Sequence, residues 1–155
     1  MPTTTRVPAA VVQPLRTRVL RPSWTDRLAT YPEDDRRTTI HLASYREGSV
    51  VAVATLYPEV PPAAHRGAIP EAAYAEGAAW RLRGMATAPL VRGAGYGAIV
   101  LSAGFDAVRD GGGSILWCNA RRVAVPFYER MGLAVVGPEF EIEGIGPHHV
   151  MWRAE

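Results

Sequence analysis

The residues from Trp80 to Gly97, WRLRGMATAPLVRGAGYG, constrain the fold of this chain more than any other stretch. An extended apolar segment leads through a proline-marked bend into a glycine-rich turn that opens a helix. The unpaired N–H groups of a helix's first turn converge on one point, and the helix dipole there favours negative charge. Glycines let a ligand approach the backbone closely, and an arginine adds a fixed positive charge. The stretch therefore predicts a diphosphate-binding turn at Arg92-Gly93-Ala94-Gly95-Tyr96-Gly97.

Two better-known phosphate loops fit this turn poorly. A P-loop needs a lysine, and all 17 basic residues of the chain are arginine. A dinucleotide-binding fingerprint needs an acidic residue about 20 positions further on to hold the ribose. The corresponding neighbourhood is Ile115-Leu116-Trp117-Cys118-Asn119 and contains no acid. A merely flexible turn is the weaker interpretation, because three alternating glycines stand at a helix start behind an arginine.

Length and composition limit the classes of function. A chain of 155 residues with 48% hydrophobic and 21% charged residues is typical of one globular domain. A net charge of +2 predicts no general attraction to nucleic acid or to an anionic membrane. A single cysteine is consistent with a reducing cytosol, and the opening MPTTTRVPAA lacks the apolar core of a signal peptide. No apolar run approaches the roughly 18 residues of a membrane span. We expect a cytoplasmic protein.

The N-terminal half predicts a helix and a hairpin. Residues 1–10 are expected to form a flexible tail, and residues 11–155 a single domain. A helix over 11–20 follows from one apolar face, whereas Arg16 and Arg18 are expected in solvent. Strands at 39–45 and 50–56 flank a turn at 46–49, and His41 is expected to be a structural histidine with satisfied hydrogen bonds. The Pro/Gly/Ala-rich residues 57–79 are expected to border an acceptor site.

The C-terminal half alternates helices with strands. Apolar residues at helical spacing predict a helix from about residue 95 to 109, ended by Asp110-Gly111-Gly112-Gly113. Residues 114–119 predict a strand covered on both faces, followed by a short helix over 123–131. Strands are then expected at 133–136, 140–145 and 147–152. The simplest fold class is mixed α/β (α+β) with one mostly antiparallel sheet.

Two motifs at this spacing resemble the GNAT superfamily of N-acetyltransferases. The first is Arg92-x-x-Gly95-x-Gly97, preceded by Leu82-Arg83-Gly84-Met85-Ala86-Thr87. The second is Ala120-Arg121-x-x-Ala124-x-x-Phe127-Tyr128-Glu129-Arg130-x-Gly132. The resemblance covers roughly residues 80 to 155. It implies a central, mostly antiparallel sheet flanked by helices on both faces, acetyl-CoA as co-substrate, and no metal.

Acyl transfer from a thioester to an amine needs a base for the amine, stabilisation of the carbonyl oxygen and a proton for the departing thiolate. By resemblance, Tyr128 is the acid beside the CoA sulfur; the alternative is that Phe127 and Tyr128 form only a packing pair. Backbone groups of Met85, Ala86 and Thr87 are expected along the pantetheine arm. The position that the superfamily often fills with Asn or Gln is here Arg121, and Asn119 falls two residues earlier, so both are candidate cofactor ligands.

The sequence leaves the base open. Histidine is the side chain suited to a base near neutral pH, and His148 and His149 are the candidates. Alternation along a strand puts only one of them toward a pocket, and His148 is preferred. Glu139, Glu141 and Glu143 compete, although a solvated acidic strand edge is their simpler explanation. An ordered water with no dedicated base is an equal alternative. Cys118 lies in an apolar strand without an activating partner, so a covalent acyl-enzyme is rejected.

The sequence thus predicts an N-acyltransferase that moves an acetyl group from acetyl-CoA to a primary amine by direct attack in a ternary complex. The acceptor is expected to be a small-molecule or peptidyl amine, and self-association as a homodimer is expected from open sheet edges. One alternative is a non-catalytic acyl-CoA-binding or regulatory module on the same fold. A second is a nucleotide-binding interaction domain.

Overall fold

The computed structural model describes residues 3–155 of the chain. Apart from the first strand, its helices and strands follow the predicted order, with three α-helices, seven strands and short 3₁₀ turns in the described residues. In chain order they are β1 (Thr3–Val7), α1 (Ala9–Leu20), η1 (Pro32–Asp35), β2 (Ile40–Arg46), β3 (Ser49–Pro58), η2 (Ala63–His65), η3 (Glu71–Tyr74), β4 (Ala79–Thr87), η4 (Pro89–Val91), α2 (Tyr96–Asp110), β5 (Ile115–Arg121), η5 (Arg122–Ala124), α3 (Val125–Arg130), β6 (Ala134–Ile142) and β7 (Gly146–Ala154).

The seven strands form one sheet in the order β1-β2-β3-β4-β5-β7-β6. The pairs β1–β2, β2–β3, β5–β7 and β6–β7 are antiparallel, and β4 runs parallel to β5 from Ala79 opposite Ile115 to Arg81 opposite Trp117. This is the mixed, mostly antiparallel α/β fold that the sequence predicts. The chain divides into two compact units, one made of the described residues up to Tyr57 with Leu82–Ala107, the other of Pro58–Arg81 with Val108–Glu155.

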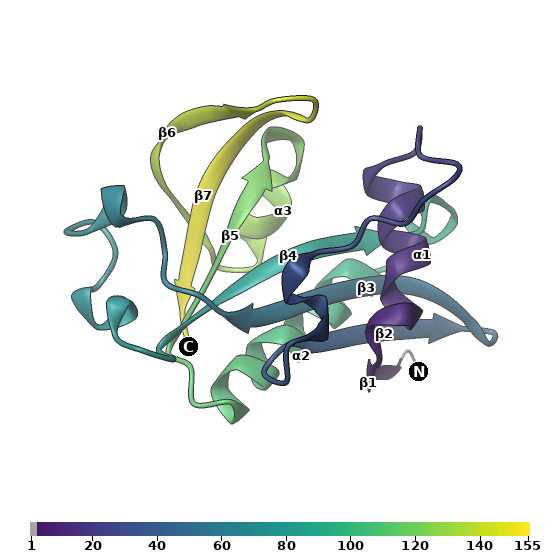
Figure 1. The fold of residues 1–155 in the computed structure, drawn as a ribbon, viewed down its shortest axis with the longest axis horizontal. Coiled ribbons are helices and arrows are strands. Elements are labelled where there is room, and N and C mark those ends of the chain that lie inside the picture. The colour runs from purple at the N-terminus through teal and green to yellow at the C-terminus, as the bar shows by residue number, and fades with distance from the viewer. Residues whose placement is uncertain (1–2) are drawn as a thin grey trace. The chain divides into compact units, whose positions relative to one another are not determined.

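In the first unit, helices cover both faces of the sheet. The α1 residues Val12 and Leu15 pack with Val53 of β3 in one buried cluster, and Figure 1 shows α1 lying across β2 and β3. On α2, the absence of a side chain at Gly104 makes room for Leu56, whose nearest carbon would lie 3.5 Å from a Cβ at that position. Since Val53 and Leu56 are three residues apart on one strand, they point to opposite faces.

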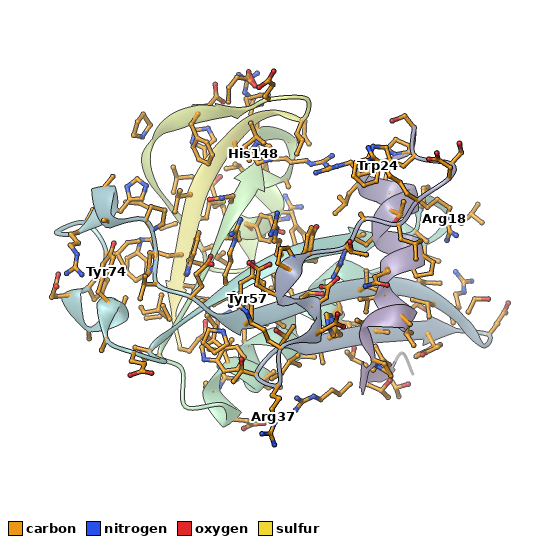
Figure 2. The ribbon with its side chains drawn as sticks, in the orientation of Figure 1. Arg18, Trp24, Arg37, Tyr57, Tyr74 and His148 are labelled. Carbon is orange, nitrogen blue, oxygen red and sulfur yellow. The ribbon has the colours of Figure 1, made fainter. Side chains whose placement is uncertain are left out.

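In the second unit, the residues between β3 and β4 cover one face of the sheet. Ile69, Ala73 and the partly buried Tyr74 pack against Trp117 of β5 and Val150 of β7. Within this segment the Tyr74 hydroxyl donates to the carbonyl oxygen of Pro62 at 2.9 Å, and Figure 2 shows its side chain among those turns. The long connection is therefore folded onto the sheet through its own apolar residues, although it contains only two short 3₁₀ turns between its ends.

Two expectations for the N-terminal region are wrong. Residues 3–7, assigned to a flexible tail over 1–10, form β1, whose register with β2 runs from Thr3 opposite Tyr45 to Val7 opposite His41. Residues 1 and 2 lie outside the described residues. A short Thr-rich segment has no periodic pattern of its own, and only the exposed edge of β2 makes it a strand.

The second error concerns Arg16, which is fully buried rather than solvated, while Arg18 is exposed and points away from α1 (Figure 2). The Arg16 guanidinium donates to both carboxylate oxygens of Asp34, at 2.8 and 3.0 Å, to the carbonyl oxygen of Ala29 at 3.0 Å and to the Thr55 hydroxyl at 2.7 Å. A buried charge is tolerated only when paired and hydrogen-bonded in this way.

This ion pair also organises its surroundings. His41 is buried, with Nδ1 2.8 Å from the Thr55 hydroxyl and Nε2 2.9 Å from the Asp34 carbonyl oxygen, which confirms the prediction of a satisfied structural histidine. Gly84 of β4 has φ +63, and a Cβ there would lie 2.7 Å from Arg16 Nε. The glycine is therefore required both by its backbone conformation and by the close approach of Arg16.

Candidate functional site

The predicted diphosphate turn lies between η4 and α2 in the first unit. Arg92, Gly93, Ala94 and Gly95 are exposed, and Tyr96 begins α2 with its side chain buried. Gly93 has φ +83 and Gly95 φ +88, the left-handed region that glycine enters at low cost. A Cβ on either glycine would meet nothing within 4 Å, so the backbone conformation, not crowding, is what requires glycine here.

The backbone donors of this turn are open to a ligand. Among the described residues, only the N–H groups of Arg92 and Ala94 bond within the turn, to the carbonyl oxygens of Pro89 and Val91. The first bond of α2 comes from Ile99 to Gly95, so the N–H groups of Gly93 and of residues 95–98 have no backbone partner in residues 3–155. Alternating left-handed residues followed by a helix start form an anion-binding concavity.

The other residues predicted to hold the cofactor in this unit end strand β4. Met85 and Thr87 are half-buried, whereas the Ala86 side chain is buried in the α1 cluster. Met85 and Thr87 thus alternate with Ala86, whose face packs against α1. The structure brings the strand end and the glycine turn together in one unit, joined by η4.

Tyr128, the predicted acid, lies on α3 in the second unit. Its side chain is buried, and its ring packs edge-on against Phe127 with 5.3 Å between the ring centroids. Burial, and to a smaller extent the nearby Cys118, raise the pKa of the Tyr128 phenol well above its usual value. The hydroxyl therefore keeps its proton at neutral pH, which a proton donor requires.

Cys118 lies on β5, close to Tyr128, and is fully buried. Burial raises the pKa of its thiol to about 12. A thiol with that pKa is almost entirely protonated at neutral pH, and only the thiolate is an effective nucleophile. The structure supports the rejection of a covalent acyl-cysteine route.

The strand register places three predicted residues on one face of the second unit. Arg121 stands opposite His148 of β7, and Asn119 stands opposite Val150. Residues directly opposite each other project to the same side, and so do residues two apart on one strand. Trp117 shares this face, whereas Cys118 and Ala120 project to the other. Asn119, Arg121 and His148 are therefore brought together, on the side of β5 opposite to Cys118.

The hydrogen bonding of His148 identifies its tautomer. His148 is buried near the start of β7, as Figure 2 shows, and its Nδ1 lies 2.7 Å from the carbonyl oxygen of Gly146. A carbonyl oxygen only accepts, so Nδ1 carries the proton and the neutral ring has its lone pair on Nε2. No residue of the described chain hydrogen-bonds to Nε2. The imidazole therefore presents a nitrogen that can accept a proton.

The competing bases are engaged or solvated. His149 Nε2 lies 3.2 Å from a carboxylate oxygen of Glu139, and the same carboxylate accepts two hydrogen bonds from Arg122 at 2.6 and 2.7 Å. Hydrogen bonding from Arg122 lowers the pKa of Glu139 to about 2. Glu139, Glu141 and Glu143 are all exposed, which agrees with their interpretation as a solvated acidic edge.

Sequence reasoning missed the ion pair between Arg81 and Glu59. Arg81 NH1 donates to the Glu59 carboxylate at 3.0 Å, and its guanidinium carbon lies 5.2 Å from the centroid of the Trp117 ring. The Trp117 indole N–H donates to the Glu59 carbonyl oxygen at 2.8 Å. The 22-residue separation of Glu59 and Arg81 leaves no local pattern that would reveal this pair.

Residues 3–155 contain no cluster of three His, Cys, Asp or Glu side chains that could hold a metal ion, and no helix among them has the length and hydropathy of a membrane span. The sequence and the fold do match known proteins. The family model described as acetyltransferase (GNAT) family matches residues 10–133. An uncharacterized N-acetyltransferase of Bacillus subtilis, YitI, is 30% identical over 139 residues, which cover 90% of this chain and 87% of that protein.

Solved structures share the fold at low identity. Escherichia coli ElaA superposes with a TM-score of 0.74 at 14% identity, covering 99% of both chains. An acyl-CoA N-acyltransferase from Pseudomonas aeruginosa gives 0.72 at 21% identity, covering 99% of this chain and all of the other. An aminoglycoside 6′-N-acetyltransferase solved with coenzyme A gives 0.72 at 13%, covering 98% and 96%. The chain therefore belongs to the acetyltransferase (GNAT) family, whose members transfer an acyl group from coenzyme A to an amine.

Proposed function

We propose that this protein is an acetyl-CoA-dependent N-acetyltransferase that acetylates a primary amine, small-molecule or peptidyl, by direct attack in a ternary complex. The observation that carries the proposal is the row of open N–H groups at Gly93 and residues 95–98, directly behind the exposed Arg92. Such a row matches the oxygens of a diphosphate, and Arg92 supplies the charge that complements it. Met85, Ala86 and Thr87 are assigned to the pantetheine arm, to which an extended backbone offers its groups.

The chemical step is assigned to residues of the second unit. The neutral amine attacks the thioester carbonyl with its lone pair, the C–N bond forms, and the amine passes one proton to His148 Nε2 while the carbonyl oxygen becomes an oxyanion. Collapse of that species breaks the C–S bond, and the Tyr128 hydroxyl gives its proton to the departing thiolate. The products are an N-acetylated amine and free coenzyme A. Solvent then takes the proton from His148 and gives one back to Tyr128. The protonated Tyr128 hydroxyl and the His148 tautomer, which leaves Nε2 as the acceptor, are consistent with these roles.

Arg121, which stands opposite His148 in the strand register, is assigned to the cofactor by its charge. A cytoplasmic location and self-association through open sheet edges are further proposals. Light scattering of the purified protein tests the second of these. An ordered water in place of His148 is the competing mechanism for the base, and it predicts that His148→Gln keeps most of the activity.

The experiment is a screen for acetyl-CoA consumption across amine classes with wild type and Tyr128→Phe. We expect an amine-dependent release of coenzyme A that falls at least about 100-fold in the variant, the usual size of a general-acid contribution. Binding of acetyl-CoA, measured by calorimetry, should be unchanged. Tyr45→Phe, a half-buried tyrosine of β2, is the matched control and should keep full activity.

Three results would contradict the proposal in different ways. Acetyl-CoA binding without turnover of any amine would favour the non-catalytic acyl-CoA-binding module. Equal activity of wild type and Tyr128→Phe would remove the acid from its role. No heat with acetyl-CoA but heat with another nucleotide would favour the nucleotide-binding domain.

A further inference from the structure

We propose that Asn119 binds the acceptor amine, together with His148, and that this pair selects primary amines over secondary amines and alcohols. The inference rests on the proposed function and deepens it by naming the groups that hold the attacking nitrogen. It also reassigns Asn119, which the sequence places among the cofactor ligands. Three observations in the second unit support it: an unsatisfied oxygen, a shared sheet face and an acceptor nitrogen.

The first observation is that Asn119 Oδ1 is buried and has no hydrogen-bond partner among residues 3–155. A buried carbonyl oxygen that accepts nothing costs the full desolvation of that group. Such groups are uncommon in native proteins, where an ordered water or a ligand that donates a hydrogen bond satisfies them. The missing partner must be a donor, because Oδ1 can only accept.

The second observation is position. Asn119 pairs with Val150, and His148 is two residues along β7 on the same face. Diagonal neighbours of this kind have Cα atoms about 7–8 Å apart, with side chains closer. Cys118, which interacts with Tyr128, projects to the other face of β5. The proposed acid and the proposed base are thus on opposite sides of the strand, and Asn119 is on the side of the base.

The third observation is that both groups of the pair accept hydrogen bonds. Nδ1 of His148 holds its proton against the Gly146 carbonyl oxygen, so Nε2 is an acceptor like Asn119 Oδ1. A neutral primary amine has two N–H groups and one lone pair, so it satisfies both acceptors and keeps the lone pair for the thioester carbonyl. A neutral secondary amine or an alcohol has one donor and leaves one acceptor unpaired. A site whose buried polar group loses its partner rejects such analogues strongly.

The composition of the chain provides a direct readout. Asn119 is its one asparagine and Gln13 its one glutamine, so a ¹⁵N-labelled sample has two side-chain carboxamide signals. Gln13 lies on α1, where its Nε2 donates to Asp34 at 3.0 Å, and it is an internal control. The two NMR probes are n-hexylamine and 1-hexanol, with coenzyme A titrated separately. N-methylhexylamine is compared with n-hexylamine by turnover, in which the neutral amine reacts, and the variants are Asn119→Leu and Asn119→Asp.

We expect n-hexylamine to shift the Asn119 carboxamide signals and not those of Gln13, with a much weaker effect of 1-hexanol, which has one hydrogen-bond donor at any pH. In the acetyl-CoA consumption assay, Asn119→Leu should lower kcat/KM for the primary amine at least about 100-fold and reduce the preference for it over the N-methyl analogue. Asn119→Asp, which keeps an accepting oxygen, should restore part of that preference. The affinity for coenzyme A should stay within about twofold of wild type in both variants.

A variant that failed to fold would not give this combination of kinetic and binding results. Removing an unsatisfied buried oxygen should leave the Tm of Asn119→Leu equal to or above that of wild type. The inference is overturned if the Asn119 signals respond to coenzyme A and not to the amine, or if Asn119→Leu raises the Kd of coenzyme A tenfold while the amine preference is kept. It is equally overturned if neither probe shifts the signals. Absence of turnover in wild type would contradict the proposed function instead, since the NMR titration does not depend on catalysis.

Discussion

Removing one partner of the buried Arg16–Asp34 pair should destabilise the protein more than any comparable change at its surface. The side chains of Arg16 and Asp34 are 0% and 2% exposed, and the two carboxylate oxygens accept separate hydrogen bonds from the guanidinium. Asp34→Ala leaves the Arg16 charge buried without its counter-ion. Breaking a buried pair in this way costs about 3–5 kcal/mol. With an m-value of about 2 kcal/mol/M, the urea midpoint falls by roughly 2 M.

The assay is urea unfolding of wild type, Asp34→Ala, Arg16→Met and the double variant Arg16→Met/Asp34→Ala. Because the double variant contains no buried charge from either residue, its loss of stability should be smaller than the sum of the two single losses by at least about 2 kcal/mol. Arg122→Met and Glu139→Gln provide the matched control. They break an exposed pair, 61% and 36% exposed, and should leave the midpoint within error.

The same pair has a defined pH dependence. Burial raises the pKa of the Asp34 carboxyl, but hydrogen bonds from Arg16, the Tyr31 N–H and Gln13 outweigh it, and the net pKa is below the ordinary 3.8. A carboxyl with a lowered pKa stabilises the fold above its unfolded pKa and loses that contribution as pH falls through the folded value. Wild type should therefore lose stability relative to Asp34→Ala only below about pH 4. Additive single losses, or a gap between the two proteins that is constant down to pH 2, would refute the reasoning.

Three further predictions concern the site. Gly95→Ala should weaken coenzyme A binding roughly tenfold in calorimetry, because a residue with a side chain at φ +88 is strained by about 1–2 kcal/mol. The control is Gly144→Ala in the β6–β7 turn, where φ is +77: it carries the same strain and should not change the affinity for coenzyme A. His148→Gln should lower kcat at least about 100-fold, and retention of most of the activity would assign the proton to water. Native Cys118 should resist iodoacetamide at neutral pH, since its pKa is about 12, and should react once urea unfolds the chain; rapid alkylation of the folded protein would contradict the burial argument.

Much of the fold could be predicted from the sequence because the patterns that indicate it are local. The apolar spacing before Asp110 and the glycines behind it predict α2 within a residue at either end, and the β-rich residues around His41 with the turn at 46–49 predict the β2–β3 hairpin. The diphosphate-binding turn was also predicted from a local pattern. Glycine and arginine at fixed offsets from a helix start determine backbone conformation and charge without reference to the rest of the chain.

The structure decided what depends on partners far away in the sequence. Helical spacing puts Arg16 beside residues expected in solvent, and only Asp34 and Thr55, 18 and 39 residues away, make it part of the core. Residues 3–7 become a strand only through the edge of β2.

The same distinction applies to the proposed amine site. The sequence by itself determined that Tyr128, His148 and Asn119 are present on a helix and two strands. Only the tertiary structure decided which face each strand residue occupies, which nitrogen of His148 keeps its proton, and that Asn119 Oδ1 has no partner. Those properties arise from strand register, burial and long-range hydrogen bonds. Each of these depends on interactions between segments far apart in the sequence, and not on the conformational preferences of a single segment.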